Sequence, residues 1–343
     1  MKRIIRFLFL LFLLAAILLA WLIFGSGTAF NEKSKFVYIH DSADVKTQVL
    51  QQLDEGGIVY SPGLFKILGN NTDLWRRLKP GKFEIKKSES LYKILRMFRN
   101  NTQSPSRLVI NKLRISEDFA KLIGKNFSTD SATAMQFLTS NDSLEQVGVD
   151  TNTLMTLVIP DTYILNWNTS VKKLLTRLRS EKENFWNKDN RREKATAQGL
   201  TELQVYTIAS IVEEETNKND EKGNVASVYI NRLNHNMYLG ADPTIKFALK
   251  DFALKRLYYG HLEVQSPYNT YKNKGLPPGP ICTPSPVTID AVLNAPKTEY
   301  LFFVAKADFS GHHQFSITYA EHEQYAKLYQ QALTEWEAKQ KNK

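Results

Sequence analysis

The sequence predicts an α+β fold in three parts: a transmembrane helix at the N-terminus, a small mixed domain, and a larger α+β domain. An uncharged apolar run covers residues 7–24. Short β-rich runs then alternate with amphipathic stretches separated by Gly and Pro. Finally, residues 203–216 have helical periodicity, whereas residues 300–305 form an aromatic run typical of a buried strand. We expect the parts to cover residues 1–30, 31–115 and 116–343.

The N-terminal apolar run follows Lys2, Arg3 and Arg6 and is long enough to cross a bilayer. Cations favour the cytoplasmic side, so a single-pass membrane anchor would place the chain after Asn31 outside the cytoplasm. A cleaved signal peptide is the alternative, because residues 27–29 resemble a cleavage site. Its apolar region normally has about 7 to 15 residues, which favours a retained anchor.

Charge and cysteine content narrow the possible partners and cofactors. The formal net charge of +10 suits anionic lipid, a carboxylate-bearing wall polymer or nucleic acid, and an outward-facing chain argues against nucleic acid. The single Cys282 excludes an internal disulfide and a zinc cluster of cysteines. His312, His313 and His322 lack metalloprotease spacing, so we predict neither a metal nor a cofactor.

Up to residue 116, segments with the apolar pattern of a β-strand alternate with segments that have the spacing of an amphipathic helix. We predict strands over 36–39, 82–85 and 107–113, and helices over 45–53, 63–68, 90–98 and from Ser116 onward. The first strand–helix–helix–strand group resembles the LysM carbohydrate-binding module in its order of elements. A spacer domain is the alternative, since no residue signature accompanies that order.

Residues 129–194 are expected to be rich in helix. A structured turn is predicted at residues 158–163, and the dense run of both charge signs over 177–194 is typical of a solvated helical face.

The helix predicted over 203–216 carries one carboxylate on its apolar side. Its apolar residues share an arc of about 120°: Val205, Ile208, Ile211 and Val212. Glu215 lies inside that arc, whereas Glu213 and Glu214 point about 80° and 180° away from Val205. Burial disfavours the charged carboxylate and raises its pKa, as a general acid requires. The alternative is a solvated helix end.

The rest of the chain combines helices, stiff loops and a strand pair. A helix is predicted over 225–233, a break at 239–244, strands at 300–305 and after the turn at 311–316, and a last helix over 318–333. The loops at 266–271 and 275–281 are rich in Tyr, Asn, Pro and Gly. Such loops suit a sugar-binding groove or, alternatively, a purely structural connection.

Six segments, taken in order, resemble the endolytic murein transglycosylase family (MltG, also called YceG-like). They are Ala209-Ser210-Ile211-Val212-Glu213-Glu214-Glu215-Thr216, Val225 to Leu233, Asp242-Pro243-Thr244, Tyr268-Asn269-Thr270-Tyr271, Gly275 to Ile281, and Tyr300 to Ala305. The similarity is close over about residues 203–329. The anchor and the first domain resemble the family only in outline.

The resemblance implies a lytic transglycosylase, a carbon–oxygen lyase. It would cleave the MurNAc–GlcNAc β-1,4 bond within peptidoglycan strands, leave 1,6-anhydroMurNAc ends, and terminate or trim nascent strands beside the synthesis machinery. The family's Glu-Lys-Glu pattern puts the catalytic carboxyl on Glu215. Two positions depart from the family pattern. Glu214 replaces the lysine, and its negative charge is expected to raise the Glu215 pKa further. Residues 283–286 stand where the family usually has Pro-Gly after the proline-rich loop. The substrate-binding residues implied by the matched motifs are Asn231, Arg232, Asp242, Tyr268, Asn269, Thr270, Pro278 and His313.

Two other functions stay open at this point. A muramidase-type hydrolase would need a second carboxylate at about 5 to 9.5 Å from the acid, for which Asp242 is the best candidate. A non-catalytic cell-wall-binding scaffold would need neither.

Overall fold

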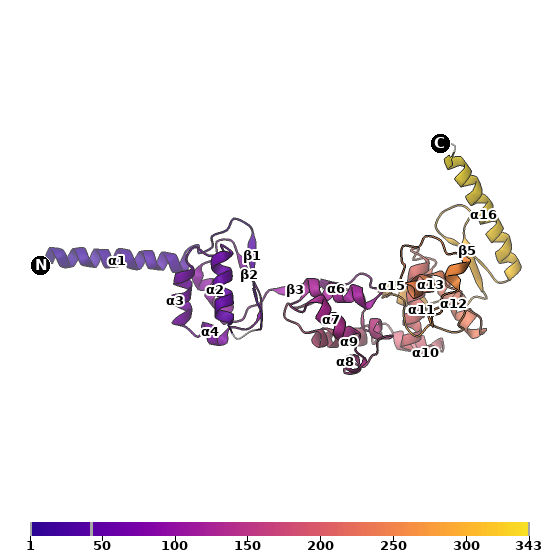
Figure 1. The fold of residues 1–343 in the computed structure, drawn as a ribbon, viewed down its shortest axis with the longest axis horizontal. Helices are drawn as coiled ribbons and strands as arrows, with labels where there is room; N and C mark the ends of the chain where they lie inside the picture. Colours follow the sequence, from indigo (N-terminus) through magenta and orange to yellow (C-terminus); the bar gives the residue numbers. More distant parts are fainter. Residues whose placement is uncertain (1, 42–43, 342–343) are drawn as a thin grey trace. The chain divides into compact units, whose positions relative to one another are not determined.

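The computed structural model describes residues 2–41 and 44–341 and forms two compact units (Figure 1). The first unit extends to Leu108 and includes two later segments, Gly124–Asp130 and Tyr163–Ser170; the second contains Val109–Ile123, Ser131–Thr162 and the chain from Val171. This division is less simple than a single boundary at residue 115. Strand β3 (Pro105–Val109) pairs with β4 (Thr162–Asn166), which brings a later segment back to the first unit.

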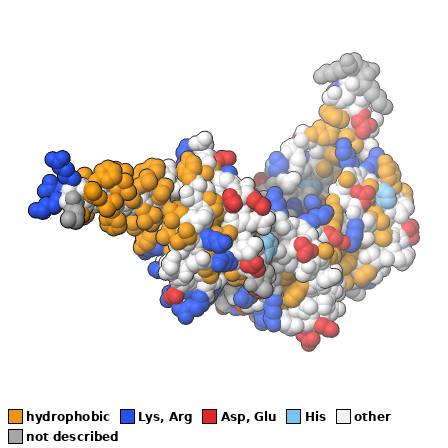
Figure 2. Space-filling model, turned by 60° about the vertical axis from the view of Figure 1, so that its left-hand side comes forward, with side chains coloured by type: hydrophobic (Ala, Val, Ile, Leu, Met, Phe, Trp, Pro, Cys, Tyr) orange, Lys and Arg blue, Asp and Glu red, His pale blue; other side chains and the backbone are white. Residues whose placement is uncertain are grey.

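Helix α1 (Lys2–Phe24) is the predicted apolar helix. No side chain is buried along this described helix, and its length and composition suffice to cross a membrane. Figure 2 shows hydrophobic side chains covering it, with Lys and Arg side chains at its N-terminal end.

The first unit has the predicted strand–helix–helix–strand order with one added short helix. Its elements are β1 (Ser34–Ile39), α2 (Val45–Glu55), α3 (Pro62–Asn70), α4 (Leu74–Arg77), β2 (Gly81–Lys86) and α5 (Leu91–Arg99). β1 and β2 are antiparallel, from Ser34 opposite Lys86 to Ile39 opposite Gly81. The core includes Phe83 and Phe98, whose rings meet edge to face at 5.0 Å.

The helix-rich region after residue 115 differs from the prediction in detail. It contains α6 (Ser116–Asn126), α7 (Ser131–Leu138), α8 (Asn141–Glu145), the 3₁₀ turn η1 (Leu154–Leu157), α9 (Val171–Trp186) and α10 (Arg191–Ala197). The predicted turn at 158–163 leads directly into β4, and the strand predicted over 107–113 is instead Pro105–Val109. The charged run is also not wholly solvated, because Arg191 is buried and its Nε lies 2.7 Å from Asp290 Oδ1.

Helix α11 (Glu202–Glu215) lies at the centre of the second unit. Thr201 and Gln204 form a reciprocal capping box at its start, and residues 205–212 are all buried. The helices packed most closely on it are α12 (Lys222–Asn234), α13 (Asp242–Leu249) and α15 (Pro286–Leu293); the short α14 (Tyr259–Leu262) lies beyond α13. Helices, rather than strands, therefore make the closest contacts with α11.

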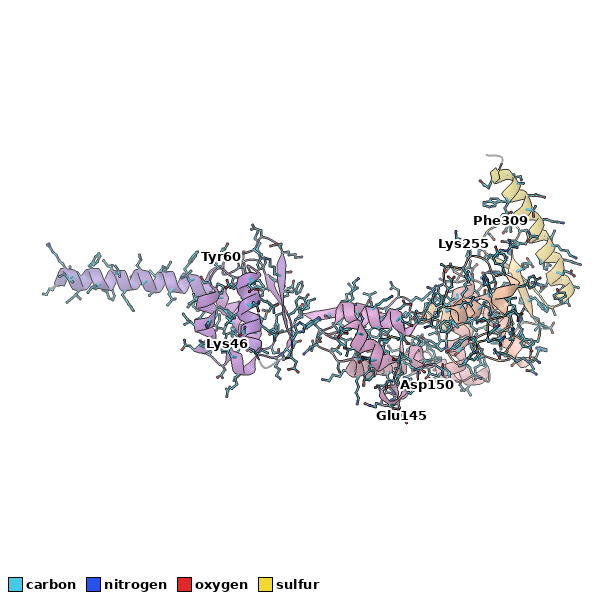
Figure 3. The ribbon with its side chains drawn as sticks, in the orientation of Figure 1. Lys46, Tyr60, Glu145, Asp150, Lys255 and Phe309 are labelled. Carbon is cyan, nitrogen blue, oxygen red and sulfur yellow. The ribbon has the colours of Figure 1, made fainter. Side chains whose placement is uncertain are left out.

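Strands β5 (Phe302–Ala305) and β6 (His313–Ser316) form an antiparallel pair. β5 is half-buried rather than buried, because a two-stranded sheet leaves much of each strand at the surface. The last helix, α16 (Tyr319–Lys341), continues beyond the predicted end at 333. Phe309, labelled in Figure 3, lies beside α16 with its ring 6.0 Å from that of Tyr329.

Reciprocal hydrogen bonds connect the segment before α6 to the loop before α15. Leu113 N donates to Thr283 Oγ1 at 2.9 Å, and Thr283 N donates to Leu113 O at 2.8 Å. Both residues belong to the second unit, so this pairing fixes the strand-like segment after Val109 against it.

Candidate active site

Glu215, the last residue of α11, is half-buried, and its carboxyl group contacts α12. Tyr229 on α12 donates its phenol O–H to Glu215 Oε1 at 2.6 Å, and the Tyr229 residue is 1% exposed. Burial raises the pKa of Glu215 to about 7; the hydrogen bond from Tyr229 and the charges of Arg232 and Lys246 oppose the rise, and the charge of Asp242 adds to it. The group can therefore hold or release a proton near neutral pH.

Replacing Tyr229 with phenylalanine should raise the Glu215 pKa by about one unit, because a hydrogen bond to the charged form is lost. We expect the alkaline limb of the activity–pH profile to move upward by a similar amount. The matched control is Tyr206→Phe on α11. It removes a buried O–H that donates to Val158 O at 2.6 Å, so it should lower the melting temperature and leave the limb in place. An unmoved limb in Tyr229→Phe would contradict this assignment.

Asp242 and Tyr271 form a second polar pair in the site. Tyr271 Oη donates to Asp242 Oδ1 at 2.5 Å, and Asp242 opens helix α13. Both side chains are exposed, and the charge of Asp242 reaches Glu215. Of the predicted binding residues, Asp242 thus acts on the candidate acid. Tyr229, Tyr271 and Lys246 were not selected from the sequence, although both tyrosines occur in the quoted motifs.

Asn231 and Arg232 hold the strand β5 region in place. Asn231 Nδ2 donates to the carbonyls of Thr298 at 2.8 Å and Tyr300 at 2.9 Å. Arg232 Nε donates to Leu301 O at 2.7 Å, and another of its nitrogens donates to Leu239 O. Because these side chains donate to backbone carbonyls, the geometry favours a structural role over glycan binding for both residues. The charge of Arg232 also acts on Glu215.

Asn269, which was predicted to contact the glycan, is fully buried in this structure. Its Nδ2 donates to Leu262 O and Val264 O, and its Oδ1 accepts a hydrogen bond from Tyr271 N at 3.0 Å. The buried Thr270 likewise accepts a hydrogen bond from Ala241 N at 2.9 Å through Oγ1. The two side chains therefore position Tyr271 and the start of α13.

The other predicted residues lie on separate segments. Tyr268 is half-buried, with its ring 4.7 Å from that of Phe247, and Pro278 is exposed. His313 pairs with Glu221, with Nδ1 2.8 Å from Oε1. Binding by Tyr268, Pro278 and His313 stays a prediction.

The expectation that Glu213 and Glu214 face solvent is wrong. Glu213 Oε2 lies 3.2 Å from Lys222 Nζ and also accepts hydrogen bonds from Thr288 and Ser285. Helix periodicity gave the direction of this side chain correctly but not the elements that cover it.

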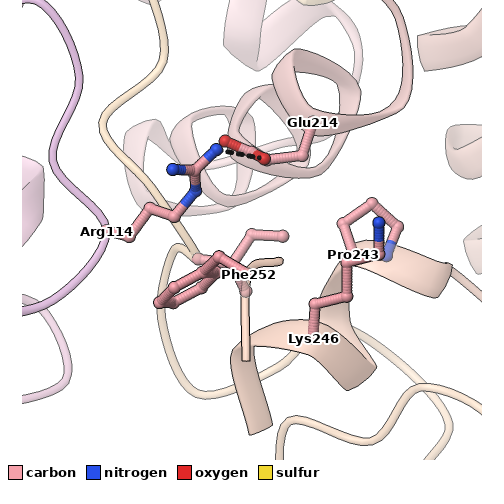
Figure 4. Close-up of a pocket in the computed structure, with 6 residues that line it drawn as sticks. Arg114, Glu214, Pro243, Lys246 and Phe252 are labelled. Carbon is pink, nitrogen blue, oxygen red and sulfur yellow. Dashed lines mark hydrogen bonds and ion pairs between the residues drawn. The ribbon is translucent and has the colours of Figure 1, made fainter. Parts of the chain in front are cut away.

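Glu214 forms ion pairs at 2.9 Å with Arg114 and at 3.1 Å with Lys112. Figure 4 shows the Arg114 pair beside a pocket also lined by Pro243, Lys246 and Phe252. The expected further rise in the Glu215 pKa from Glu214 is not found; the charges that act most on Glu215 are those of Asp242, Arg232 and Lys246. Two cations compensate the Glu214 carboxylate locally.

Across residues 2–41 and 44–341, no group of three or more His, Cys, Asp or Glu side chains is placed to hold a metal ion.

Comparisons with known proteins agree on one family. The model of the YceG-like family matches residues 37–328. The endolytic murein transglycosylase of Bacillus subtilis (strain 168) is 41% identical over 128 residues, which cover 36% of this chain and 34% of that protein. The enzyme of the same name from Streptococcus pneumoniae D39 is 27% identical over 309 residues, covering 80% of this chain and 55% of that protein.

The fold has a solved relative as well. The 2.6 Å crystal structure of the yceG-like protein lmo1499 from Listeria monocytogenes matches 86% of this chain and 99% of its own, with a TM-score of 0.55 and 26% identity. The chain spans 34% and 55% of the two transglycosylases named above. A family match over most of the sequence, joined to the Glu215 site, shows that the chain belongs to the YceG-like family.

Proposed function

We propose that the protein is a membrane-anchored endolytic transglycosylase that cleaves the MurNAc–GlcNAc β-1,4 bond within peptidoglycan strands and leaves 1,6-anhydroMurNAc ends. The observation that carries the proposal is Glu215, a half-buried carboxyl group that Tyr229 hydrogen-bonds and whose pKa is raised to about 7, in a YceG-like chain. The relatives named endolytic murein transglycosylase support the same substrate class. No metal or cofactor takes part in the proposed reaction.

In the proposed mechanism Glu215 acts twice. Its protonated form donates to the glycosidic oxygen as the bond to C1 of the muramyl residue breaks. The resulting carboxylate then takes the proton of the muramyl 6-hydroxyl, whose oxygen bonds to C1 and closes the anhydro ring. The positive charge that develops on the sugar during cleavage would be stabilised by Asp242, which Tyr271 orients.

A muramidase-type hydrolase is the second candidate, because Asp242 is close enough for its charge to raise the Glu215 pKa. In that reaction Asp242 would act as nucleophile or would activate water. A scaffold without catalysis is the third possibility, but it gives no role to the raised pKa of Glu215.

Mass spectrometry of the products from purified glycan strands separates these functions. We expect 1,6-anhydroMurNAc ends released from the middle of strands, at a rate unchanged by chelator. Strands O-acetylated at the muramyl 6-hydroxyl should resist cleavage because the nucleophile is blocked. Reducing muramic acid ends would establish the hydrolase, and intact strands the scaffold.

Activity should depend on pH through the protonated form of Glu215. With a pKa of about 7, the fraction able to donate a proton falls as pH rises through 7. We therefore expect kcat/KM to decrease about tenfold per pH unit at alkaline pH, as measured with a soluble glycan oligomer. A profile that stays level to pH 9 would contradict Glu215 as the acid.

The same proposal assigns roles to helix α1 and to the first unit. Helix α1 would hold the protein in the cytoplasmic membrane, with both units outside the cytoplasm and close to the peptidoglycan synthesis machinery. The strand–helix–helix–strand group of the first unit would serve as a LysM-like module before the catalytic region.

A further inference from the structure

The junction between α1 and the first unit contains no free linker. Gly25 N donates to Trp21 O at 2.8 Å, and Gly27 N already donates to Glu89 O at 2.9 Å within the folded unit. Thr28 then forms an antiparallel bridge with Val59. The ring of Phe24, the last residue of α1, lies 5.2 Å from that of Tyr92 on α5. The surface around this junction is therefore fixed to the end of the helix.

The length of the apolar run places this junction at a membrane boundary, provided that α1 is the proposed anchor. Residues 7–24 in a helix extend about 27 Å, close to the hydrocarbon thickness of about 30 Å. Phe24 then ends the hydrocarbon core, and a layer of headgroups about 5 to 8 Å thick follows. Protein surface within that distance of Phe24 must lie among headgroups.

Aromatic side chains occupy this surface. A hollow beside α1 is lined by Trp21, Tyr60, Ser61 and Leu91 among others. Tyr60 is 70% exposed and Tyr92 is 43% exposed. Tyr and Trp concentrate where a bilayer meets water, because their rings suit the apolar boundary while their polar atoms stay hydrated.

A basic groove has Tyr92 in its lining. Its charged lining among the described residues is Lys86, Lys93 and Arg96 with one carboxylate, Glu89, a net charge of +2. Lys93 Nζ lies 2.8 Å from Glu89 Oε1, and the Arg96 guanidinium lies 5.8 Å from the Tyr92 ring centre. From Tyr92 to Arg96 is about one helical turn, or 6 Å, so both cations are within reach of headgroup phosphates.

We propose that this interfacial surface, defined by Tyr60, Tyr92, Lys86, Lys93 and Arg96, rests in the headgroup layer and binds anionic phospholipid. The tyrosines would lie at the boundary of the hydrocarbon, and the cations would contact phosphate oxygens. The anchor then fixes the orientation of the first unit as well as its location. A lipid surface, rather than the glycan, is the partner of this face.

Photocrosslinking in nanodiscs tests the inference with the full chain. p-Benzoylphenylalanine replaces Tyr60, Tyr92 or, as control, the exposed Tyr38, which pairs with Lys82 about 13 Å along β2 from Lys86. The nanodiscs contain phosphatidylcholine with a minor fraction of phosphatidylglycerol, and mass spectrometry identifies each lipid adduct. We expect adducts at positions 60 and 92 but not at 38, with phosphatidylglycerol enriched about fivefold over its mole fraction at 92.

Charge reversal by Lys93→Glu with Arg96→Glu should abolish the enrichment at position 92 and leave the adducts at position 60. Adducts with the composition of the bilayer, unchanged by charge reversal, would overturn anionic lipid binding. Adducts no more frequent at 60 and 92 than at 38 would overturn the interfacial surface. Retention of the chain in the nanodisc, measured by size exclusion in the same samples, reports on the anchor separately; release from the disc would refute the anchor and, with it, this inference.

Discussion

Glu215→Gln is expected to abolish glycan cleavage, with a loss of at least about a thousandfold, because the amide can neither donate the first proton nor accept the second. The fold should survive, since glutamine keeps the shape and Tyr229 can still donate to the remaining carbonyl oxygen. Activity on purified strands and the melting temperature are the measurements. Glu214→Gln is the matched control and should retain most activity. A dead Glu213→Gln enzyme with an intact fold would instead move the catalytic carboxyl to Glu213.

The same substitution should change how stability depends on pH. The folded-state pKa of Glu215 is raised from 4.5 to about 7, so the folded protein binds the proton more tightly than the unfolded chain. The stability from this proton is fully present below pH 4.5 and is lost as pH rises through 7. Relative to wild type, Glu215→Gln should therefore gain stability between pH 4.5 and 8, by up to roughly 3 kcal/mol.

Lys222→Met is expected to destabilise the fold by about 3 to 5 kcal/mol, because it leaves the Glu213 carboxylate shielded and without its cation. The Lys222 side chain is 6% exposed and that of Glu213 14% exposed, and Lys222 Nζ also donates to Thr288 Oγ1 at 2.7 Å. Denaturant unfolding measures the loss. Adding Glu213→Gln should recover part of it, since the unpaired charge disappears while the amide keeps its size. An unchanged unfolding midpoint in Lys222→Met would show that this pair does not stabilise the fold.

Helix periodicity identified the candidate acid but not the groups that control it. The arc shared by Val205, Ile208 and Val212 depends only on local geometry, so it could be read from the sequence, and it included Glu215. The pairing of Glu215 with Tyr229 depends on how two helices pack. The covering of Glu213 was missed for the same reason, because only tertiary structure brings Lys222 over it.

Two of the helices that were not predicted begin with proline. α13 and α15 both carry proline in their first turn, at Pro243 and Pro286. We interpreted the segment with Pro243 as a break, but the first turn of a helix needs no amide hydrogen from proline. The motif containing Asp242 is therefore a helix start.

The roles of two asparagines could not be decided from the sequence for a different reason. Asn231 and Asn269 have the side chains that bind sugars, and the same donors satisfy backbone carbonyls. Residue type cannot separate these uses, because burial decides between them. Contact with the glycan stays a prediction for both residues, and their hydrogen bonds to backbone favour a supporting role.

The hydrogen bonds between Leu113 and Thr283 join positions 170 residues apart, which has a consequence for the order of folding. A chain made at about 5 to 20 residues per second needs roughly 10 to 30 seconds between these two points. Until Thr283 emerges, the segment carrying Lys112 and Arg114 lacks its final position, even after Glu214 has appeared. The second unit must therefore complete its folding late, and a chain truncated to begin at residue 116 would lack both cations that neutralise Glu214.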